Sequence, residues 1–229
     1  EQPQGMGTVT PQGTVFRGIY SLEQTLFLVD GQPWNSGFTD YFYYSYIPSE
    51  AIQRIEVVRG PFSSLYGSNA MAGVVHVITR DGMNEPAHVG AFYNFGDYGR
   101  QEIGVTLSGR FEDKASIFAS YSTYSTDNYY LHDELEDEID NTTEDEWDNR
   151  DYEHDRYHVH ARLNPTDDVE VHLSGGGYRN RTGFGTGDIG EGEFDNYKDV
   201  NRYYINFRTN MWISEGAEVF VAYDYVFDE

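Results

Sequence analysis

Apolar and polar residues alternate in seven segments that together occupy most of the chain from Ala87 onward. In residues 156–163 the apolar set is Tyr157, Val159, Ala161 and Leu163, and the polar set is His158, His160 and Arg162. A period of two places such sets on opposite faces of a β-strand. The segments are residues 87–95, 101–110, 115–124, 156–163, 169–178, 201–210 and 217–227. The sequence therefore predicts a mainly β fold.

The connections between these segments separate a membrane barrel from a soluble sandwich, because both architectures show the alternation. The second, fourth and sixth segments are followed by tight connections, at residues 111–114, 164–168 and 211–216. The third and fifth are followed by long ones, at residues 125–155 and 179–200. Short turns at one end and long loops at the other are typical of outer-membrane barrels, whose tilted strands need about 9–11 residues to cross. We therefore expect antiparallel strands of an outer-membrane β-barrel.

Composition excludes several classes of function. The chain has 15 basic and 39 acidic residues, a net charge of −24, whereas nucleic-acid binding requires clustered Lys and Arg. It has no cysteine, so disulfides and thiolate sites are excluded. No apolar run approaches the roughly 18 residues of a membrane-spanning helix. The 20 Tyr and 14 Phe residues suit the aromatic girdles of a barrel.

A second signal lies before the alternating segments. Two strand-like runs, residues 54–58 and 74–79, enclose a connection that is rich in Gly and Ser. That connection contains Arg59-Gly60-Pro61, Ser63-Ser64-Leu65-Tyr66-Gly67 and Ala70-Met71-Ala72-Gly73. Its glycines mark tight turns or close backbone approaches. Together with the upstream Leu26-Phe27-Leu28-Val29-Asp30-Gly31-Gln32-Pro33, this block closely resembles the plug domain of TonB-dependent outer-membrane receptors.

The resemblance implies a fold class and a division into domains. We expect a small mixed α/β plug domain at residues 1–86, without its start, followed at residues 87–229 by the N-terminal strands of a transmembrane β-barrel. Plugged transporters have about 22 strands. Seven strands would leave open edges that lipid does not tolerate. We therefore expect this chain to be an N-terminal part of a longer receptor.

The resemblance also assigns candidate site residues. A motif for contact between plug and barrel, or for gating, comprises Glu56, Arg59, Gly60, Pro61, Tyr66 and Gly67. Simple ion pairing and turn chemistry are the alternatives for these residues. The aromatic loop at residues 34–46 corresponds to the family's outward-facing ligand loop, and its candidate ligand-binding residues are Trp34, Asn35, Phe38, Tyr41, Tyr43 and Tyr44. Aromatic faces with hydroxyl tips suit flat, partly apolar ligands, although core packing is the alternative.

Histidines on the polar faces raise the hypothesis of a metal site. If the turn at residues 164–168 pairs positions that sum to 332, His160 lies opposite His172, and Arg162 lies opposite Glu170. Such neighbours could share a metal ion. Polar residues facing a watery lumen are the more favoured interpretation. The acidic segment 133–155 could bind calcium, but it lacks EF-hand spacing and fits a solvated outer loop better.

Two functional hypotheses follow. By resemblance, the chain serves TonB-dependent uptake of a scarce nutrient, with a ferric siderophore favoured over cobalamin, haem and glycans. Its partners would be the TonB energy-coupling complex, the ligand and outer-membrane lipid, with no nucleic acid and no cofactor, in the bacterial outer membrane. The alternative is a non-transporting β-rich adhesin or scaffold module. No catalytic constellation is recognisable, so an enzyme is not predicted.

Overall fold

The computed structural model of the protein describes residues 15–16, 19–20, 24–35, 46–84, 87–97, 99–126, 152–183, 197–214 and 217–228. These residues form two main sheets and a separate two-stranded pair, β1 (Val15–Phe16) with β2 (Ile19–Tyr20). Among the described residues, no helix combines the length and the apolar character needed to cross a membrane. The predicted fold class, mainly β with a small mixed region, is confirmed.

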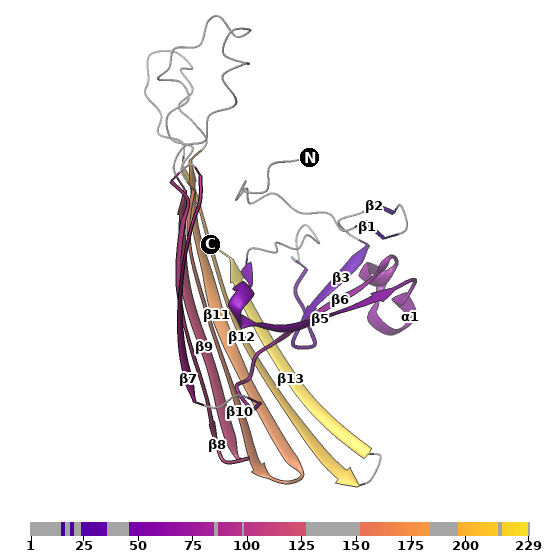
Figure 1. Ribbon diagram of the computed structural model, residues 1–229. Coiled ribbons are helices and arrows are strands. Elements are labelled where there is room, and N and C mark those ends of the chain that lie inside the picture. The colour runs from indigo at the N-terminus through magenta and orange to yellow at the C-terminus, as the bar shows by residue number, and fades with distance from the viewer. Residues whose placement is uncertain are drawn as a thin grey trace, which may run out of the picture.

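The larger sheet, called the wall sheet below, has seven antiparallel strands in the order β13-β12-β11-β10-β9-β8-β7, so that each strand pairs with its neighbours in sequence (Figure 1). The strands are β7 (His88–Phe95), β8 (Gln101–Phe111), β9 (Ala115–Thr126), β10 (Tyr152–Thr166), β11 (Val169–Gly183), β12 (Tyr197–Ser214) and β13 (Ala217–Asp228). All seven predicted segments are therefore strands.

Strand β10 begins earlier than predicted. Residues 152–155, expected to belong to an acidic loop, pair with residues 123–126 of β9 and 179–182 of β11. The Tyr121 hydroxyl donates a hydrogen bond to Asp155 across this ladder at 2.9 Å. Backbone pairing on both sides explains the extension, since strand propensity depends on cross-strand neighbours more than on composition.

The two faces of the wall sheet differ in the way that the alternation predicts. One face exposes large apolar side chains, among them Val105, Leu107, Val159, Ile205 and Phe207. The opposite face buries polar side chains, among them His158, His160, Asn180, Arg202 and Asn206. This is the reverse of a soluble sheet, and it is what a sheet between lipid and a polar interior requires.

The predicted register between β10 and β11 is wrong by two residues. The structure pairs Arg162 with His172 and His160 with Ser174. The ladder is irregular between Leu163 and Thr166, a stretch that contains Pro165, which has no backbone N–H to donate. Because the side-chain period is two, a shift of two keeps every residue on its predicted face.

The smaller sheet, called the plug sheet below, has the order β4-β3-β6-β5. It consists of β3 (Thr25–Val29), β4 (Gln32–Pro33), β5 (Ile52–Arg59) and β6 (Gly73–Thr79), with β3 and β6 parallel and the other pairs antiparallel. The strand-like runs predicted at residues 54–58 and 74–79 are confirmed as parts of β5 and β6, and a 3-10 turn, η2 (Ser49–Ala51), precedes β5. The single-turn helix α1 (Ser63–Tyr66) and the 3-10 turn η3 (Ser68–Ala70) were not predicted, because Gly and Ser dominate that connection.

The core joins the two sheets. Phe27, Val29, Trp34 and Val75 of the plug region belong to one apolar cluster with Tyr178 and Tyr204 of the wall. The chain leaving β6 also touches the wall at Gly82, where a Cβ atom would lie 2.2 Å from the Ile117 carbonyl oxygen of β9. Gly82 has a φ of 77°, so both conformation and space favour glycine there. The domain boundary predicted after residue 86 stays a prediction.

Candidate functional site at the plug–wall interface

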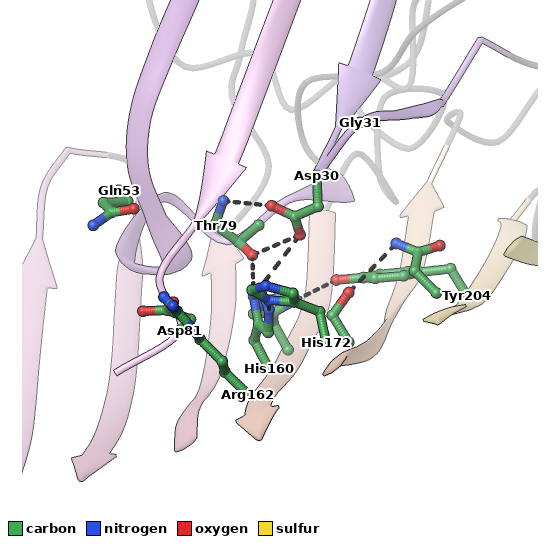
Figure 2. A network of polar contacts seen from close by, with 12 residues as sticks. Asp30, Gly31, Gln53, Thr79, Asp81, His160, Arg162, His172 and Tyr204 are labelled. Atoms are coloured by element: carbon green, nitrogen blue, oxygen red, sulfur yellow. Dashed lines mark hydrogen bonds and ion pairs between the residues drawn. The ribbon is translucent and has the colours of Figure 1, made fainter. Parts of the chain in front are cut away.

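A polar network connects the plug sheet to the wall sheet (Figure 2). Its plug side begins at Asp30 and Thr79, which lie just after β3 and at the last residue of β6. Because β3 and β6 are parallel, the carboxyl ends of both strands, and with them these two residues, lie at the same end of the plug sheet. The Asp30 carboxylate accepts hydrogen bonds from the Thr79 backbone N–H at 2.8 Å and from the Thr79 hydroxyl at 2.7 Å.

The network crosses to the wall through two histidines. Thr79 Oγ1 lies 2.8 Å from His160 Nδ1, and Asp30 Oδ2 lies 3.9 Å from the same nitrogen. His160 Nε2 lies 3.0 Å from His172 Nδ1, and His172 Nε2 lies 2.5 Å from Glu170 Oε1. A continuous chain of polar contacts therefore runs from the plug carboxylate Asp30 to the wall carboxylate Glu170.

Arg162 closes the network on its other side. Its guanidinium donates to Asp81 of the plug at 3.2 Å and to Glu170 of the wall. Burial acts to raise the pKa of Asp81, but the Met83 backbone N–H, the Arg162 hydrogen bond and nearby positive charge outweigh it, so the pKa lies below its usual value. Asp81 therefore stays ionised and holds Arg162 between the two sheets.

A cavity of about 350 Å³ lies beside this network. Besides network residues it is lined by Gln32, Gln53, Arg54, His76, Arg208 and Asn210. His76 Nε2 accepts a hydrogen bond from the Gly31 backbone N–H at 2.9 Å. Burial lowers the pKa of His76, against the opposing charges of Glu56 and Asp30, so the ring is neutral near pH 7.

Aromatic contacts form the second part of the interface. Trp34 meets Tyr204 of β12 edge-on at 4.7 Å between ring centroids, and Tyr46 meets Tyr178 of β11 at 4.9 Å. The Arg202 guanidinium lies 5.2 Å from the Trp34 ring centroid and 4.8 Å from that of Tyr46. These plug residues are therefore packed against the inner face of the wall.

The predicted ligand-binding residues fall into two groups. Trp34 is only 1% exposed, and Asn35 binds back to β3 through Phe27 N and Thr25 O at 2.8 and 3.0 Å. Both residues thus have a structural role in the described arrangement. Phe38, Tyr41, Tyr43 and Tyr44 lie outside the described residues. Ligand contact by any of the six stays a prediction.

The predicted gating residues lie on exposed parts of the plug. Glu56 pairs with Arg54 of its own strand at 2.8 Å, and this hydrogen bond lowers the pKa of Glu56. Arg59, Pro61 and Tyr66 are exposed, and α1 projects away from the wall in Figure 1. Gly60 donates to the Ala72 carbonyl at 3.1 Å, and Gly67 has a φ of 88°. A gating role for this motif stays a prediction.

The network contains three plug residues that sequence reasoning missed. Asp30 was considered only as part of the plug-like block, Thr79 only as the end of a strand-like run, and Asp81 was not singled out. Of the wall residues, His160 and His172 were singled out as weak metal candidates. No group of three or more His, Asp or Glu side chains within the described part of the chain is arranged to hold a metal ion. The two rings instead contact each other directly.

Part of the chain matches a known domain family and several curated proteins. Residues 4–74 match the TonB-dependent Receptor Plug Domain family. The vitamin B12 transporter BtuB of Vibrio vulnificus (strain YJ016) is 33% identical over 116 residues, which are 51% of this chain and 19% of BtuB. The ferrienterobactin receptor of Escherichia coli (strain K12) is 40% identical over 73 residues, which are 28% of this chain and 10% of that receptor.

The fold comparison extends across both sheets. The crystal structure of the ferric enterobactin receptor PfeA of Pseudomonas aeruginosa (mutant R480A, in complex with enterobactin) aligns with a TM-score of 0.64 at 18% identity. The alignment covers 90% of this chain and 34% of that receptor. The chain thus matches a fifth or less of the two curated relatives and about a third of the solved structure. Residues 4–74 therefore match a TonB-dependent receptor plug domain, and the chain as a whole has the fold of the plug and adjoining wall of a solved outer-membrane receptor.

Proposed function

We propose that this chain serves TonB-dependent uptake of a scarce nutrient across the outer membrane, with a ferric siderophore as the favoured ligand. The observation that carries the proposal is the seating of the plug sheet on the polar face of a wall whose other face is apolar. A plug held there by polar contacts blocks a lumen until it is moved. Transport then needs no covalent chemistry, only different ligand affinities of the closed and opened states.

The choice of ligand class rests on the relatives. These relatives include receptors for ferric enterobactin and a vitamin B12 transporter. We favour a siderophore because the aromatic residues of segment 34–46 suit a flat, partly apolar chelate. Cobalamin is the second candidate, supported by the match to BtuB over 51% of this chain. The family consists of receptors and transporters, so we propose no enzymatic activity.

The proposal is tested by deleting the gene that encodes this chain and measuring uptake of radiolabelled iron from a panel of ferric siderophores under iron limitation. We expect uptake of one siderophore to fall to background and to return with the intact gene. A strain without TonB should show the same loss even when the gene is present. Unchanged uptake of every siderophore, with loss of labelled cobalamin uptake, would transfer the proposal to cobalamin. Unchanged uptake of both classes would leave the adhesin or scaffold alternative.

A further inference from the structure

We propose that the plug–wall network binds one proton. All the contacts of this network, called the latch below, form between plug and wall only when that proton is bound. The inference rests on the proposed function, because the step it regulates is movement of the plug. It concerns the chain of contacts Asp30–Thr79–His160–His172–Glu170, shown with most of its members in Figure 2.

This chain of contacts needs one more hydrogen than its neutral members supply. The chain contains four contacts at hydrogen-bond distance, of 2.7, 2.8, 3.0 and 2.5 Å. Each contact needs one hydrogen between its two heavy atoms. An ionised carboxylate supplies none, a hydroxyl supplies one and a neutral imidazole supplies one. Thr79, His160 and His172 thus supply three hydrogens for four contacts, and one further proton must be bound.

This count does not depend on which tautomers are present. If the Thr79 hydroxyl donates to Asp30, then His160 must donate from Nδ1 and accept at Nε2. His172 must then donate from Nδ1 to His160, which leaves its neutral Nε2 facing the Glu170 carboxylate as a second acceptor. Any other assignment moves the missing hydrogen to a different contact without supplying it.

The fourth proton belongs on the histidine pair. Glu170 also accepts a hydrogen bond from Arg162, whose guanidinium can only donate, so both Glu170 oxygens act as acceptors in the network. Both oxygens of Asp30 likewise accept hydrogen bonds, from the backbone N–H and the hydroxyl of Thr79. With both carboxylates ionised, His172 carries hydrogens on both nitrogens and donates to His160 and to Glu170. The imidazolium then satisfies all four contacts.

The surrounding charge is compatible with this proton. Asp30, Asp81 and Glu170 are three carboxylates in contact with the network, and Arg162 is the one guanidinium bonded to it among the described residues. Within the described part of the chain, further titratable or charged groups facing the network or its cavity include His158 of β10, His76 of β6, Arg54 of β5, and Tyr204 and Arg208 of β12. One bound proton reduces the network's net charge from −2 to −1, which lowers repulsion between plug and wall carboxylates.

The proton can exchange with water. Glu170, His172 and Arg162 line the cavity of about 350 Å³ beside the network. They lie close to the tight turn between β10 and β11, the end of the wall opposite the long connections. If the short turns are periplasmic, as in outer-membrane barrels, the latch responds to the pH on that side.

The sign of the pH effect follows from linkage. The seated plug binds one proton more than the unseated plug, in which an ordinary histidine titrates near pH 6.5. The latch is therefore complete at low pH and weakens as pH rises. The equilibrium constant for plug opening should increase by up to about tenfold per pH unit above about pH 6.5.

A single engineered cysteine can measure this opening, because the chain has none of its own. Ala51 is fully buried in η2, so the variant Ala51→Cys reacts with a maleimide only when the plug moves. The A51C protein, as expressed from its gene, is placed in nanodiscs and labelled at a series of pH values. After correction for the thiolate fraction of the cysteine, we expect the labelling rate to rise by roughly tenfold or more from about pH 6 to about pH 8. A flat corrected profile would overturn the proposal.

The decisive variant is Glu170→Gln in the A51C background. The glutamine amide donates the missing hydrogen to neutral His172 Nε2, and its oxygen still accepts from Arg162, so the network closes without the extra proton. Labelling should then change by less than about twofold over the same range. The matched control is Glu102→Gln, which alters another inner-face carboxylate bonded to an arginine, Arg156, at 2.7 Å. We expect it to keep the wild-type slope, and a wild-type slope in E170Q would refute the proposal.

A second measurement uses the unmutated protein, in case E170Q fails to fold. Nitrogen NMR of histidine-labelled protein should show an imidazolium signal at about pH 7.5, where free histidine is mostly neutral. Only neutral rings at that pH would contradict the proposal. Neither measurement depends on transport. If the uptake experiment fails but maleimide labelling still rises with pH, the proposed function is rejected and the proposed proton site is retained.

Discussion

Replacing Gly82 by alanine is expected to prevent stable seating of the plug on the wall. The new Cβ atom would lie 2.2 Å from the Ile117 carbonyl oxygen and 2.7 Å from its carbonyl carbon, and both are backbone atoms that cannot rotate away. A non-glycine residue at the positive φ of 77° adds about 1–3 kcal/mol of strain. We expect a total loss of about 3 kcal/mol or more in the free energy of unfolding, measured by urea titration of the purified protein in detergent.

The matched control is Gly67→Ala. Gly67 also has a positive φ, 88°, but nothing lies within 4 Å of the position that its Cβ would occupy. The G67A variant therefore has the backbone strain without the steric clash, and its free energy of unfolding should fall by about 1–3 kcal/mol. Equal losses for the two variants would mean that the close approach of Gly82 to β9 contributes nothing to seating. Gly67 also belongs to the predicted gating motif, so an uptake defect in G67A that is larger than this loss of stability explains would support that motif.

The alternation of apolar and polar residues predicted which side chains share a face of each wall strand. It did not predict that the plug sheet covers the polar face. His158, His160 and Arg162 were placed on a polar face, and the structure confirms that placement. The burial of His158 and His160, with His158 at 0% exposure, depends on the plug sheet lying over that face. A period of two specifies a face of one strand and carries no information about a different sheet packed on it.

The register of β10 with β11 shows a second limit. It results from a turn of only two residues, 167–168, in place of the five predicted, and from the irregularity between Leu163 and Thr166. A ladder shifts by two residues without changing the pattern of faces, so hydrophobic alternation could not select between the two registers. The network was missed for a related reason. Asp30, Thr79 and His160 are separated by 49 and 81 residues in sequence, and only the parallel pairing of β3 with β6 brings the first two together.

Trp34 provides the second large expected effect. Its side chain is 1% exposed and fills the space between the plug sheet and β12 against Tyr204 and Arg202. Trp34→Ala should lower the free energy of unfolding by about 3–5 kcal/mol, the usual result of emptying a core position of this size. Trp34→Phe keeps an aromatic ring in the same space and should lose less, about 1–2 kcal/mol. Urea titration of both variants measures the difference.

The same pair of variants separates packing from ligand contact at Trp34. If the indole acts only by packing, W34F should bind the ligand with nearly wild-type affinity once the plug is folded. If the indole ring contacts the ligand, W34F should lose affinity out of proportion to its loss of stability. Because the described side chain is inaccessible, contact would further require that the plug residues around Trp34 move when the ligand binds. The ligand affinity of W34F, compared with its stability, therefore decides whether Trp34 contacts the ligand or only packs between the plug sheet and the wall.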